Sequence, residues 1–127
     1  MMIFKLKTSK ETMMIFAEIN SSVHLQPFAL CKLSLALSLR SDRPLSDEDF
    51  KTNTDGLELN RQTITGEYDE LFKALIMSFE GKFISDEEYF PKYLKSHIDR
   101  GAALLQAEFK YSNGQLYHHL LNIDKGV

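Results

Sequence analysis

Cysteine is almost absent from this chain of 127 residues, in which Cys31 is the single example. One thiol cannot form an internal disulfide framework, a zinc site made of cysteines alone, or an iron–sulfur cluster held within one chain. A lone thiol suits a reducing compartment. Because Cys31 lies in an apolar segment, we expect its side chain to be buried and inert rather than nucleophilic.

Long apolar runs are also missing. The most apolar stretch, residues 30–39, is far shorter than the ~20 residues that cross a bilayer, and it contains Lys32. The first seven residues have no long apolar stretch of the kind found in a secretory signal. These absences predict a cytoplasmic protein with no membrane partner.

An excess of positive charge is missing as well. The chain has 15 basic and 18 acidic residues, a net charge of -3, which excludes a uniformly basic DNA binder. The distribution is uneven, because residues 1–43 carry a net charge of +3 and residues 44–127 a net charge of -6. Such asymmetry can mark a local nucleic-acid surface on an acidic body, although solvated faces also differ in charge by chance.

Residues 4–8 alternate apolar and polar side chains, which predicts a short strand. Phe4 and Leu6 are expected to face the core, and Lys5 and Lys7 to face outward. Such a strand could begin a DNA-binding ribbon, or it could be an edge strand whose lysines prevent unwanted pairing.

Two helices are expected after this strand. Thr8 and Glu11 match a capping box, which predicts a helix to about Ile19 that is then broken by residues 20–22. This helix is apolar around most of its circumference, so a subunit interface is a natural interpretation. Pro27 suits the first turn of a second helix that runs to about Leu39.

The order strand, helix, helix is that of a ribbon-helix-helix (Arc/MetJ) unit. In that unit two chains pair their first strands into a ribbon that enters a DNA groove. Lys5 and Lys7 would be the outward side chains of such a ribbon. We therefore predict a mainly α fold with a short N-terminal strand, a ribbon-helix-helix-like start and additional C-terminal helices.

The rest of the chain is expected to be loops and helices of the same domain. Residues 40–54 read as a polar loop, and residues 55–69 as a structured loop that ends in a helix capped by Thr65 or Gly66. This helix is expected to stop at Gly81. The domain would span residues 1–127, with a strand-helix-helix unit (1–43), a loop and helices (44–109) and a C-terminal tail (110–127).

Two further signals concern the last helices. Ser85 to Glu88 match a second capping box, and Pro91 indicates that any helix opened there is broken or restarted. Apolar residues from Leu94 to Phe109 recur at helical spacing, and Gly101 inside that helix predicts close packing against another backbone. Residues 117–121 are expected to form a weak terminal helix or a tail.

Catalytic signatures are absent from the sequence, which contains no phosphate-binding glycine loop, nucleophile elbow or zinc-protease motif. His97 and Arg100, one helical turn apart, are expected to pair with acids such as Glu67 or Asp69. Arg61, which follows Asn60, suits phosphate, but an ion pair between its loop and a helix carboxylate is the favoured interpretation. No enzyme activity, metal site or cofactor is predicted.

One long run of residues resembles the signature of the DndE family of DNA sulfur-modification (phosphorothioation) proteins. Its members here are Gly56, Glu58, Asn60, Arg61, Thr63, Thr65, Gly66, Glu67, Tyr68, Asp69, Leu71, Phe72, Ala74 and Leu75. Residues 27–39, and later His97, Arg100 and Gly101, resemble the flanking motifs of the family in the same order. The resemblance covers roughly residues 4–107.

The resemblance implies a small helical protein that assembles as a homo-oligomer, with a tetramer favoured. It implies a non-catalytic subunit that acts beside the other proteins of a DNA phosphorothioation system and binds duplex DNA, with nicked duplex as the ligand attributed to the family. A ribbon-helix-helix transcriptional regulator, or a scaffold that binds only the partner proteins, remains as an alternative.

The resemblance also concerns the residues that contact DNA. Lysines of the first helix have been linked to DNA binding in the family, whereas the first helix here offers only Lys10 at its start. The DNA-binding candidates are therefore the basic residues of the first 43 positions: Lys5, Lys7, Lys10, Lys32, Arg40 and Arg43.

Overall fold

The computed structural model describes residues 3–113 and 115–122. Its elements follow the chain in this order: β1 (Lys5–Lys7), α1 (Lys10–Val23), α2 (Pro27–Arg40), η1 (Asp49–Lys51), β2 (Glu58–Asn60), α3 (Arg61–Ile64), η2 (Gly66–Tyr68), α4 (Asp69–Glu80), α5 (Asp86–Glu88), η3 (Tyr89–Leu94), α6 (Lys95–Ser112) and α7 (Leu116–Leu121). The expected mainly α fold with a strand-helix-helix start is confirmed. Within the described ranges, no helix has both the length and the apolar character needed to span a bilayer.

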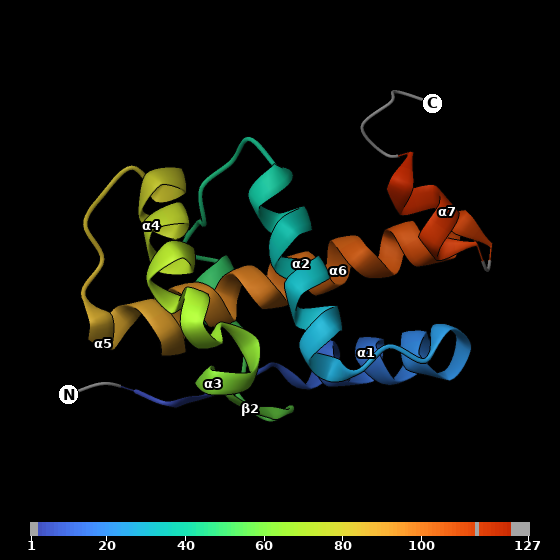
Figure 1. Ribbon diagram of the computed structural model, residues 1–127, viewed down its shortest axis with the longest axis horizontal. Coiled ribbons are helices and arrows are strands. Elements are labelled where there is room, and N and C mark those ends of the chain that lie inside the picture. Colours follow the sequence, from blue (N-terminus) through green and yellow to red (C-terminus); the bar gives the residue numbers. More distant parts are fainter. Residues whose placement is uncertain (1–2, 114, 123–127) are drawn as a thin grey trace.

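Helix α6 runs along the long axis of the molecule, and the other helices pack around it (Figure 1). Its most extensive contact is with α2, which crosses it. Gly101 lies at this crossing, and a Cβ atom there would be 1.7 Å from the Ser34 carbonyl oxygen. The predicted close backbone approach at Gly101 is therefore confirmed.

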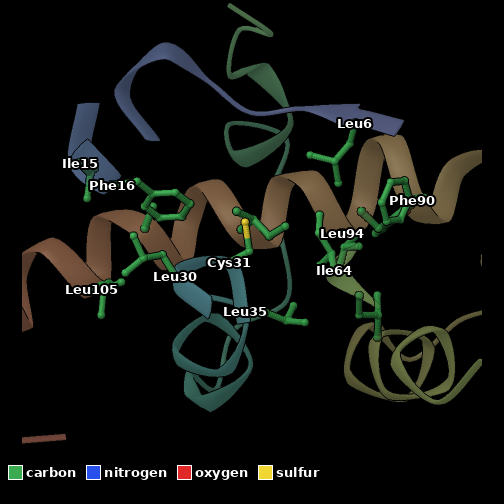
Figure 2. Packing of buried hydrophobic residues seen from close by; sticks show 14 of the residues in the cluster. Leu6, Ile15, Phe16, Leu30, Cys31, Leu35, Ile64, Phe90, Leu94 and Leu105 are labelled. Atoms are coloured by element: carbon green, nitrogen blue, oxygen red, sulfur yellow. The ribbon is translucent and has the colours of Figure 1, made fainter. Parts of the chain in front are cut away.

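The hydrophobic core lies along α6, between this helix and α1, α2 and α3 (Figure 2). The side chains that fill it include Leu6, Phe16, Ile19, Leu30, Cys31, Leu35, Ile64, Phe90, Leu94, Ile98 and Leu105. Cys31 is fully buried, and burial raises the pKa of its thiol to about 12. The expected burial of Cys31 is confirmed, and a thiol with that pKa stays protonated at neutral pH.

The strand β1 pairs antiparallel with β2 of the same chain, with Lys5 opposite Asn60 and Lys7 opposite Glu58. Leu6 is buried and both lysines are exposed, as predicted. The expectation for Phe4 was wrong, because its side chain is 63% exposed. Its backbone carbonyl still accepts a hydrogen bond from the Arg61 amide at 2.7 Å, so the side chain leaves the core although the backbone stays paired.

Helix α1 begins one residue later and ends four residues later than predicted. Ser9, not Thr8, is the N-cap, and its side chain accepts a hydrogen bond from the Thr12 amide. The expected break at residues 20–22 was wrong, because Ser21 bonds its hydroxyl to the Glu18 carbonyl and stays helical. Helix α2 has Pro27 in its first turn and matches the prediction closely.

The segment between α2 and α4 has more regular structure than predicted. Strand β2, the single-turn helix α3 and the 3-10 turn η2 occupy the expected loop, and α4 has Tyr68 rather than Thr65 or Gly66 at its N-cap. Thr65 is instead buried, with its hydroxyl bonded to the Arg61 carbonyl oxygen. The predicted stop at Gly81 is confirmed, since Gly81 adopts a left-handed conformation with φ of 72°.

Residues 86–112 form a continuous helical run that passes through Pro91. The segment around this proline, η3, is a π-helix, whose wider turn accommodates a residue without an amide hydrogen. The helix is therefore not interrupted at Pro91, and what changes there is the type of helix, from α to π. Ser85 is the N-cap residue of α5, but its side chain makes no capping bond to a backbone amide. The predicted terminal helix is present as α7, and residues 114 and 123–127 of the expected tail lie outside the described residues.

Candidate nucleic-acid interface

The ribbon formed by β1 and β2 exposes lysine side chains at one edge of the molecule. Lys5 and Lys7 point outward from β1, and Lys10 is exposed at the start of α1. Lys5 lies 3.6 Å from the carboxylate of Glu58 across the ribbon, with both side chains more than half exposed. Exposed pairs of this kind contribute little stability, so the lysine remains available to another anion.

The other three basic candidates lie elsewhere. Arg40 ends α2 and Arg43 follows it, and Figure 1 shows this end of α2 on the opposite side of the molecule from β1. Arg43 donates to Asp49 at 3.0 Å. Lys32 is exposed on α2, with its Nζ 5.7 Å from the centre of the Phe28 ring. The six candidates therefore do not form one patch on a single chain.

The signature residue Arg61 is buried at the junction of β2, α3 and α4. Its Nε and Nη2 atoms donate to the two carboxylate oxygens of Asp69, at 3.0 and 2.5 Å, and Nη2 also donates to Asp86 at 3.0 Å. Its Nη1 donates to the Ile3 carbonyl oxygen at 2.8 Å. The favoured interpretation of Arg61, an ion pair from its loop to a helix carboxylate, is confirmed.

Asp69, the main partner of Arg61, also accepts hydrogen bonds from two hydroxyl groups. It accepts hydrogen bonds from Thr65 at 2.6 Å and from the Tyr89 hydroxyl at 3.2 Å. Burial alone would raise the pKa of Asp69, but hydrogen bonds from Arg61 and Thr65, with the charge of Arg61, hold it below its ordinary value. The guanidinium also lies 5.2 Å from the ring centres of Tyr89 and Phe90. The network therefore joins the signature segment to α5 and η3.

The remaining signature residues divide into inward and outward positions. Asn60 caps α3 by accepting the Gln62 amide, and Gly56 lies so close to α1 that a Cβ atom would be 2.1 Å from the Ser9 carbonyl oxygen. Gly66 adopts a positive φ of 51° in the turn before α4. The exposed side chains of the signature include those of Glu58, Thr63, Glu67, Tyr68, Leu71, Ala74 and Leu75.

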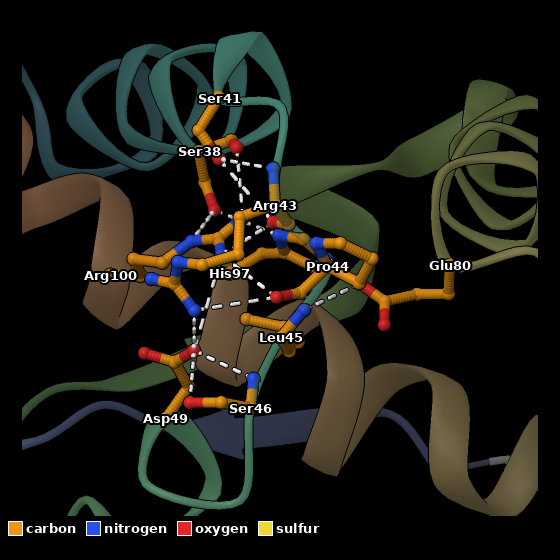
Figure 3. Close-up of polar contacts among 10 residues, drawn as sticks. All are labelled: Ser38, Ser41, Arg43, Pro44, Leu45, Ser46, Asp49, Glu80, His97 and Arg100. Carbon is orange, nitrogen blue, oxygen red and sulfur yellow. Dashed lines mark hydrogen bonds and ion pairs between the residues drawn. The ribbon is translucent and has the colours of Figure 1, made fainter.

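His97 and Arg100 belong to a second buried network (Figure 3). The Arg100 Nε donates to the Ser38 hydroxyl at 2.8 Å, and this hydroxyl lies 2.8 Å from Nδ1 of His97. The His97 Nε2 lies 3.0 Å from the carboxylate of Glu80, and Arg100 lies 3.9 Å from Asp49. The expected pairing with acids is confirmed, but the acids are Glu80 and Asp49 rather than Glu67 and Asp69, because α6 faces the end of α4 and the loop after α2 at this point.

The hydrogen bonds of this network are compatible with a neutral His97. Nδ1 accepts from Ser38 and Nε2–H donates to Glu80, so we assign the neutral tautomer with hydrogen on Nε2. Burial lowers the pKa of His97 to about 3, and the charge of Arg100 acts in the same direction while Asp49 opposes it. The side chain is completely buried and remains uncharged at neutral pH.

This pKa predicts a loss of stability in mild acid. An unfolded histidine takes up a proton near its ordinary pKa of about 6.5, whereas folded His97 does so only near 3. The unfolded chain thus binds more protons between these values, and the free energy of unfolding should fall by about 2 kcal/mol from about pH 7 to pH 5. Urea unfolding at a series of pH values measures this loss.

The matched variants are His97→Gln and His24→Gln. Glutamine at position 97 cannot titrate, so the part of the pH dependence that comes from His97 should disappear. His24 is exposed, so replacing it should leave the slope in place. Identical pH profiles for wild type and His97→Gln would show that His97 is not the group responsible.

A third polar cluster was not anticipated from the sequence. Buried Asp99 accepts hydrogen bonds from the Ser9 amide at 3.1 Å, Thr12 at 2.6 Å and Thr52 at 2.7 Å, and lies 2.7 Å from Nζ of Lys95. A carboxylate at the N-terminus of α1 is favoured by the helix dipole. Lys95 and Asp99 are four residues apart, a spacing that resembles an ordinary surface pair, so the pattern alone does not indicate burial.

His119 bonds to Glu108, its neighbour across the α6–α7 turn, and in the described parts of the chain no group of three or more His, Cys, Asp or Glu side chains is arranged to hold a metal ion. The fold and these clusters define a small, mainly α-helical protein with three internal polar networks. One edge of the molecule is formed by the β1–β2 ribbon, on which Lys5 and Lys7 are exposed.

Comparison with protein families identifies this fold. The family model for the DNA sulphur modification protein DndE matches residues 5–113. The chain belongs to the DndE family, which is involved in DNA phosphorothioation.

Two solved structures share the fold. DndE from Escherichia coli B7A, involved in DNA phosphorothioation modification, has a TM-score of 0.66 and 19% sequence identity, over 81% of this chain and 98% of that chain. A double glycine-to-lysine variant of DndE gives a TM-score of 0.65 and 19% identity, over 82% of this chain and 98% of that one. The comparison with curated proteins gave no match.

Proposed function

We propose that this protein is a non-catalytic, oligomeric subunit of a DNA phosphorothioation system that binds duplex DNA, including nicked duplex, beside the other modification proteins. The observation that carries the proposal is the exposed ribbon edge with Lys5, Lys7 and Lys10, together with membership of the family. Lysines suit contacts with the phosphate backbone. A nick adds a flexible step, which a protein can recognise through backbone contacts and deformability.

The non-catalytic part of the proposal rests on how the reactive side chains are used. Arg61 directs its guanidinium to two carboxylates and a carbonyl oxygen, and His97 is buried and uncharged. The Cys31 thiol is buried with a pKa of about 12. These groups stabilise the fold, and the side chains that face solvent at the ribbon edge are suited to binding.

The oligomeric part follows from the small number of basic side chains. Three lysines on one edge of an acidic chain make a weak site for a duplex. Copies of the site on an oligomer act together on one DNA molecule, which raises the overall affinity without new contacts. The affinity should then depend steeply on salt, because several phosphates are neutralised at once.

The test is a titration of intact and nicked duplex with the full chain at two salt concentrations. The variant Lys5→Gln/Lys7→Gln should bind at least about tenfold more weakly at low salt and show a shallower salt dependence. The control variant Lys51→Gln/Lys110→Gln removes two exposed lysines from the acidic part of the chain and should bind almost normally.

Three results would decide against the proposed function. Absence of binding to either duplex at low salt would favour a scaffold that contacts only the partner proteins, especially if the chain co-purifies with them. Equal loss in the ribbon and control variants would mean that the ribbon is not the contact surface. Preference for one operator sequence would favour the ribbon-helix-helix regulator. In that alternative β1 would pair with β1 of a second chain, whereas here β1 pairs with β2 of the same chain. Thr8, which follows the strand, is buried.

A further inference from the structure

Phe4 is an exposed aromatic residue at the start of the β1–β2 ribbon. Its side chain is 63% exposed, whereas that of Leu6, two residues further along the chain, is 3% exposed. A lone exposed apolar side chain is ordinary on a protein surface. Phe4 is distinguished by how its backbone is held and by the charges that follow it.

The backbone at Phe4 is fixed by the signature residue Arg61. The Arg61 amide donates to the Phe4 carbonyl oxygen at 2.7 Å, and the guanidinium Nη1 donates to the Ile3 carbonyl oxygen at 2.8 Å. The guanidinium is buried and is held in turn by Asp69 and Asp86. Phe4 therefore presents its ring to solvent from a rigid backbone, which reduces the entropy lost when the ring binds a partner.

Positive charge follows Phe4 along the strand. Lys5 is its direct neighbour and Lys7 comes two residues later, and both side chains are exposed. Glu58, the acid on the opposite strand, lies 3.6 Å from Lys5 in a solvent-exposed pair that is easily exchanged for another contact. The side chains next to Phe4 on β1 therefore suit an anion.

The carboxylates around Arg61 do not reverse this charge. Asp69 pairs with Arg61, and Asp86 pairs with Arg61 and, at 3.7 Å, with Lys73. Two cations thus balance two carboxylates, so this cluster adds no net negative charge close to the Ile3 carbonyl oxygen and to Phe4.

An aromatic ring beside ammonium groups is a combination that suits unstacked nucleic-acid bases. Lysines contact phosphates, and a ring stacks on a base of any sequence because every base has a π face. Along an extended strand, Phe4 and Lys7 are about 10 Å apart, which corresponds to about three nucleotide steps of one DNA strand. The ring and both lysines therefore fit one short segment of DNA.

A continuous duplex does not offer a free base face, because each base is covered by its neighbours in the stack. At a nick one strand is interrupted, so the two flanking base pairs separate at a lower cost and uncover a base. Apolar side chains, phenylalanine among them, occupy such opened base steps in proteins that kink DNA.

We propose that Phe4 stacks on a nucleobase uncovered at a break in one strand of a duplex, while Lys5 and Lys7 contact the phosphates beside it. The proposal deepens the DNA-binding part of the proposed function and rests on it. The lysines supply affinity for any duplex, and the ring supplies the preference for a nicked one. Arg61 then contributes indirectly, because it fixes the backbone that presents the ring.

The first test compares nicked and intact duplex of one sequence, titrated with the full chain at low salt. Phe4→Ala and Phe4→Leu should each bind nicked duplex roughly fivefold to a hundredfold more weakly, because neither side chain stacks on a base. Binding to intact duplex should stay close to that of the wild type, since the phosphate contacts remain. Far-UV circular dichroism establishes that each variant is folded.

The matched control is Tyr111→Ala. It removes a 78% exposed aromatic ring from the C-terminal end of α6. Figure 1 shows this end of α6, next to α7, toward the opposite end of the long axis from β1. Tyr111→Ala should therefore change neither affinity.

The second test uses fluorescence. The chain contains no tryptophan, so Phe4→Trp carries a single indole at the ribbon. This variant should keep the preference for nicked duplex, and its emission should be quenched more strongly by nicked than by intact duplex, because the indole stacks on a base. Tyr111→Trp should respond weakly and equally to both.

Three results would overturn the proposal and leave DNA binding by the lysines in place. They are an unchanged affinity of Phe4→Ala for nicked duplex, an equal loss for nicked and intact duplex, and wild-type behaviour of Phe4→Leu, which would replace stacking by an ordinary apolar contact. A changed mass of Phe4→Ala with the nick preference retained would assign the ring to a contact between chains instead. If the wild type binds neither duplex, the proposal and the DNA part of the proposed function fail together.

Discussion

Replacing Gly101 with alanine should destabilise the protein by roughly 3 kcal/mol or more. A Cβ atom at this position would lie 1.7 Å from the Ser34 carbonyl oxygen and 2.3 Å from its carbonyl carbon, and both atoms belong to the backbone of α2. No rotation of a side chain relieves such an overlap, so α2 and α6 would have to separate. The loss exceeds the ~1 kcal/mol that alanine gains over glycine inside a helix. Urea unfolding followed by circular dichroism measures the net effect.

Ser34→Ala is the matched control at the same crossing. The Ser34 hydroxyl is buried and, within the described part of the chain, has no hydrogen-bond partner. Its removal should leave stability unchanged or raise it by about 1 kcal/mol, because the cost of burying an unpaired hydroxyl disappears. If Gly101→Ala unfolded at the wild-type urea concentration, the helices would not be in the contact described here.

Replacing Arg61 with methionine should destabilise the protein by about 3 to 5 kcal/mol. Its side chain is 5% exposed, and Asp69, its main partner, is 15% exposed. Methionine would leave this carboxylate buried without its cation, and would also free the Ile3 carbonyl oxygen and Asp86. Urea unfolding at neutral pH measures the loss, since the carboxylates are ionised there.

Two further variants serve as comparisons for Arg61→Met. Arg61→Lys should recover only a small part of the stability, because an ammonium group cannot make the parallel bonds of a guanidinium to one carboxylate. Lys51→Met breaks an exposed pair with Glu48 and should cost no more than about 1 kcal/mol. Equal effects of Arg61→Met and Lys51→Met would contradict the structural role assigned to Arg61.

These predictions bear on how the family signature is interpreted. Arg61 and Gly101 lie in runs that resemble family motifs, yet both act inside the fold. Loss of DNA binding in variants at these two positions would therefore report unfolding. Lys5 and Lys7, which face solvent on β1, are the positions where loss of binding reports on a contact surface.

Several features of the fold could be predicted because their causes are local. Pro27 begins α2, and Gly81 ends α4 in a left-handed conformation, since both residues restrict or permit backbone angles by their own chemistry. Gly101 indicated close packing, because glycine lowers the stability of a helix and is expected inside one where a neighbouring backbone needs the space of a side chain. Arg61 indicated an internal ion pair, because a guanidinium can form two parallel hydrogen bonds with a carboxylate on a nearby helix.

Other features could not be predicted because they depend on distant parts of the chain. His97 pairs with Glu80 and Ser38, rather than with the acids suggested by the signature, because α6 brings it to the end of α4. Asp99 is buried because Ser9 and Thr52 surround it from remote segments. The alternation in residues 4–8 placed Leu6 correctly and Phe4 wrongly, since the tertiary structure covers the side chain of Leu6 and leaves that of Phe4 exposed.

The sequence by itself determined that the chain is mainly helical, where most of its helices lie, and the family to which it belongs. These depend on backbone preferences, on side chains three or four residues apart, and on the order of a long signature. Only the tertiary structure decided which faces are covered: it buries Ile76 and exposes Leu71 and Leu75 on the same apolar helix. Burial depends on what packs against a face, and the partner can come from anywhere in the chain.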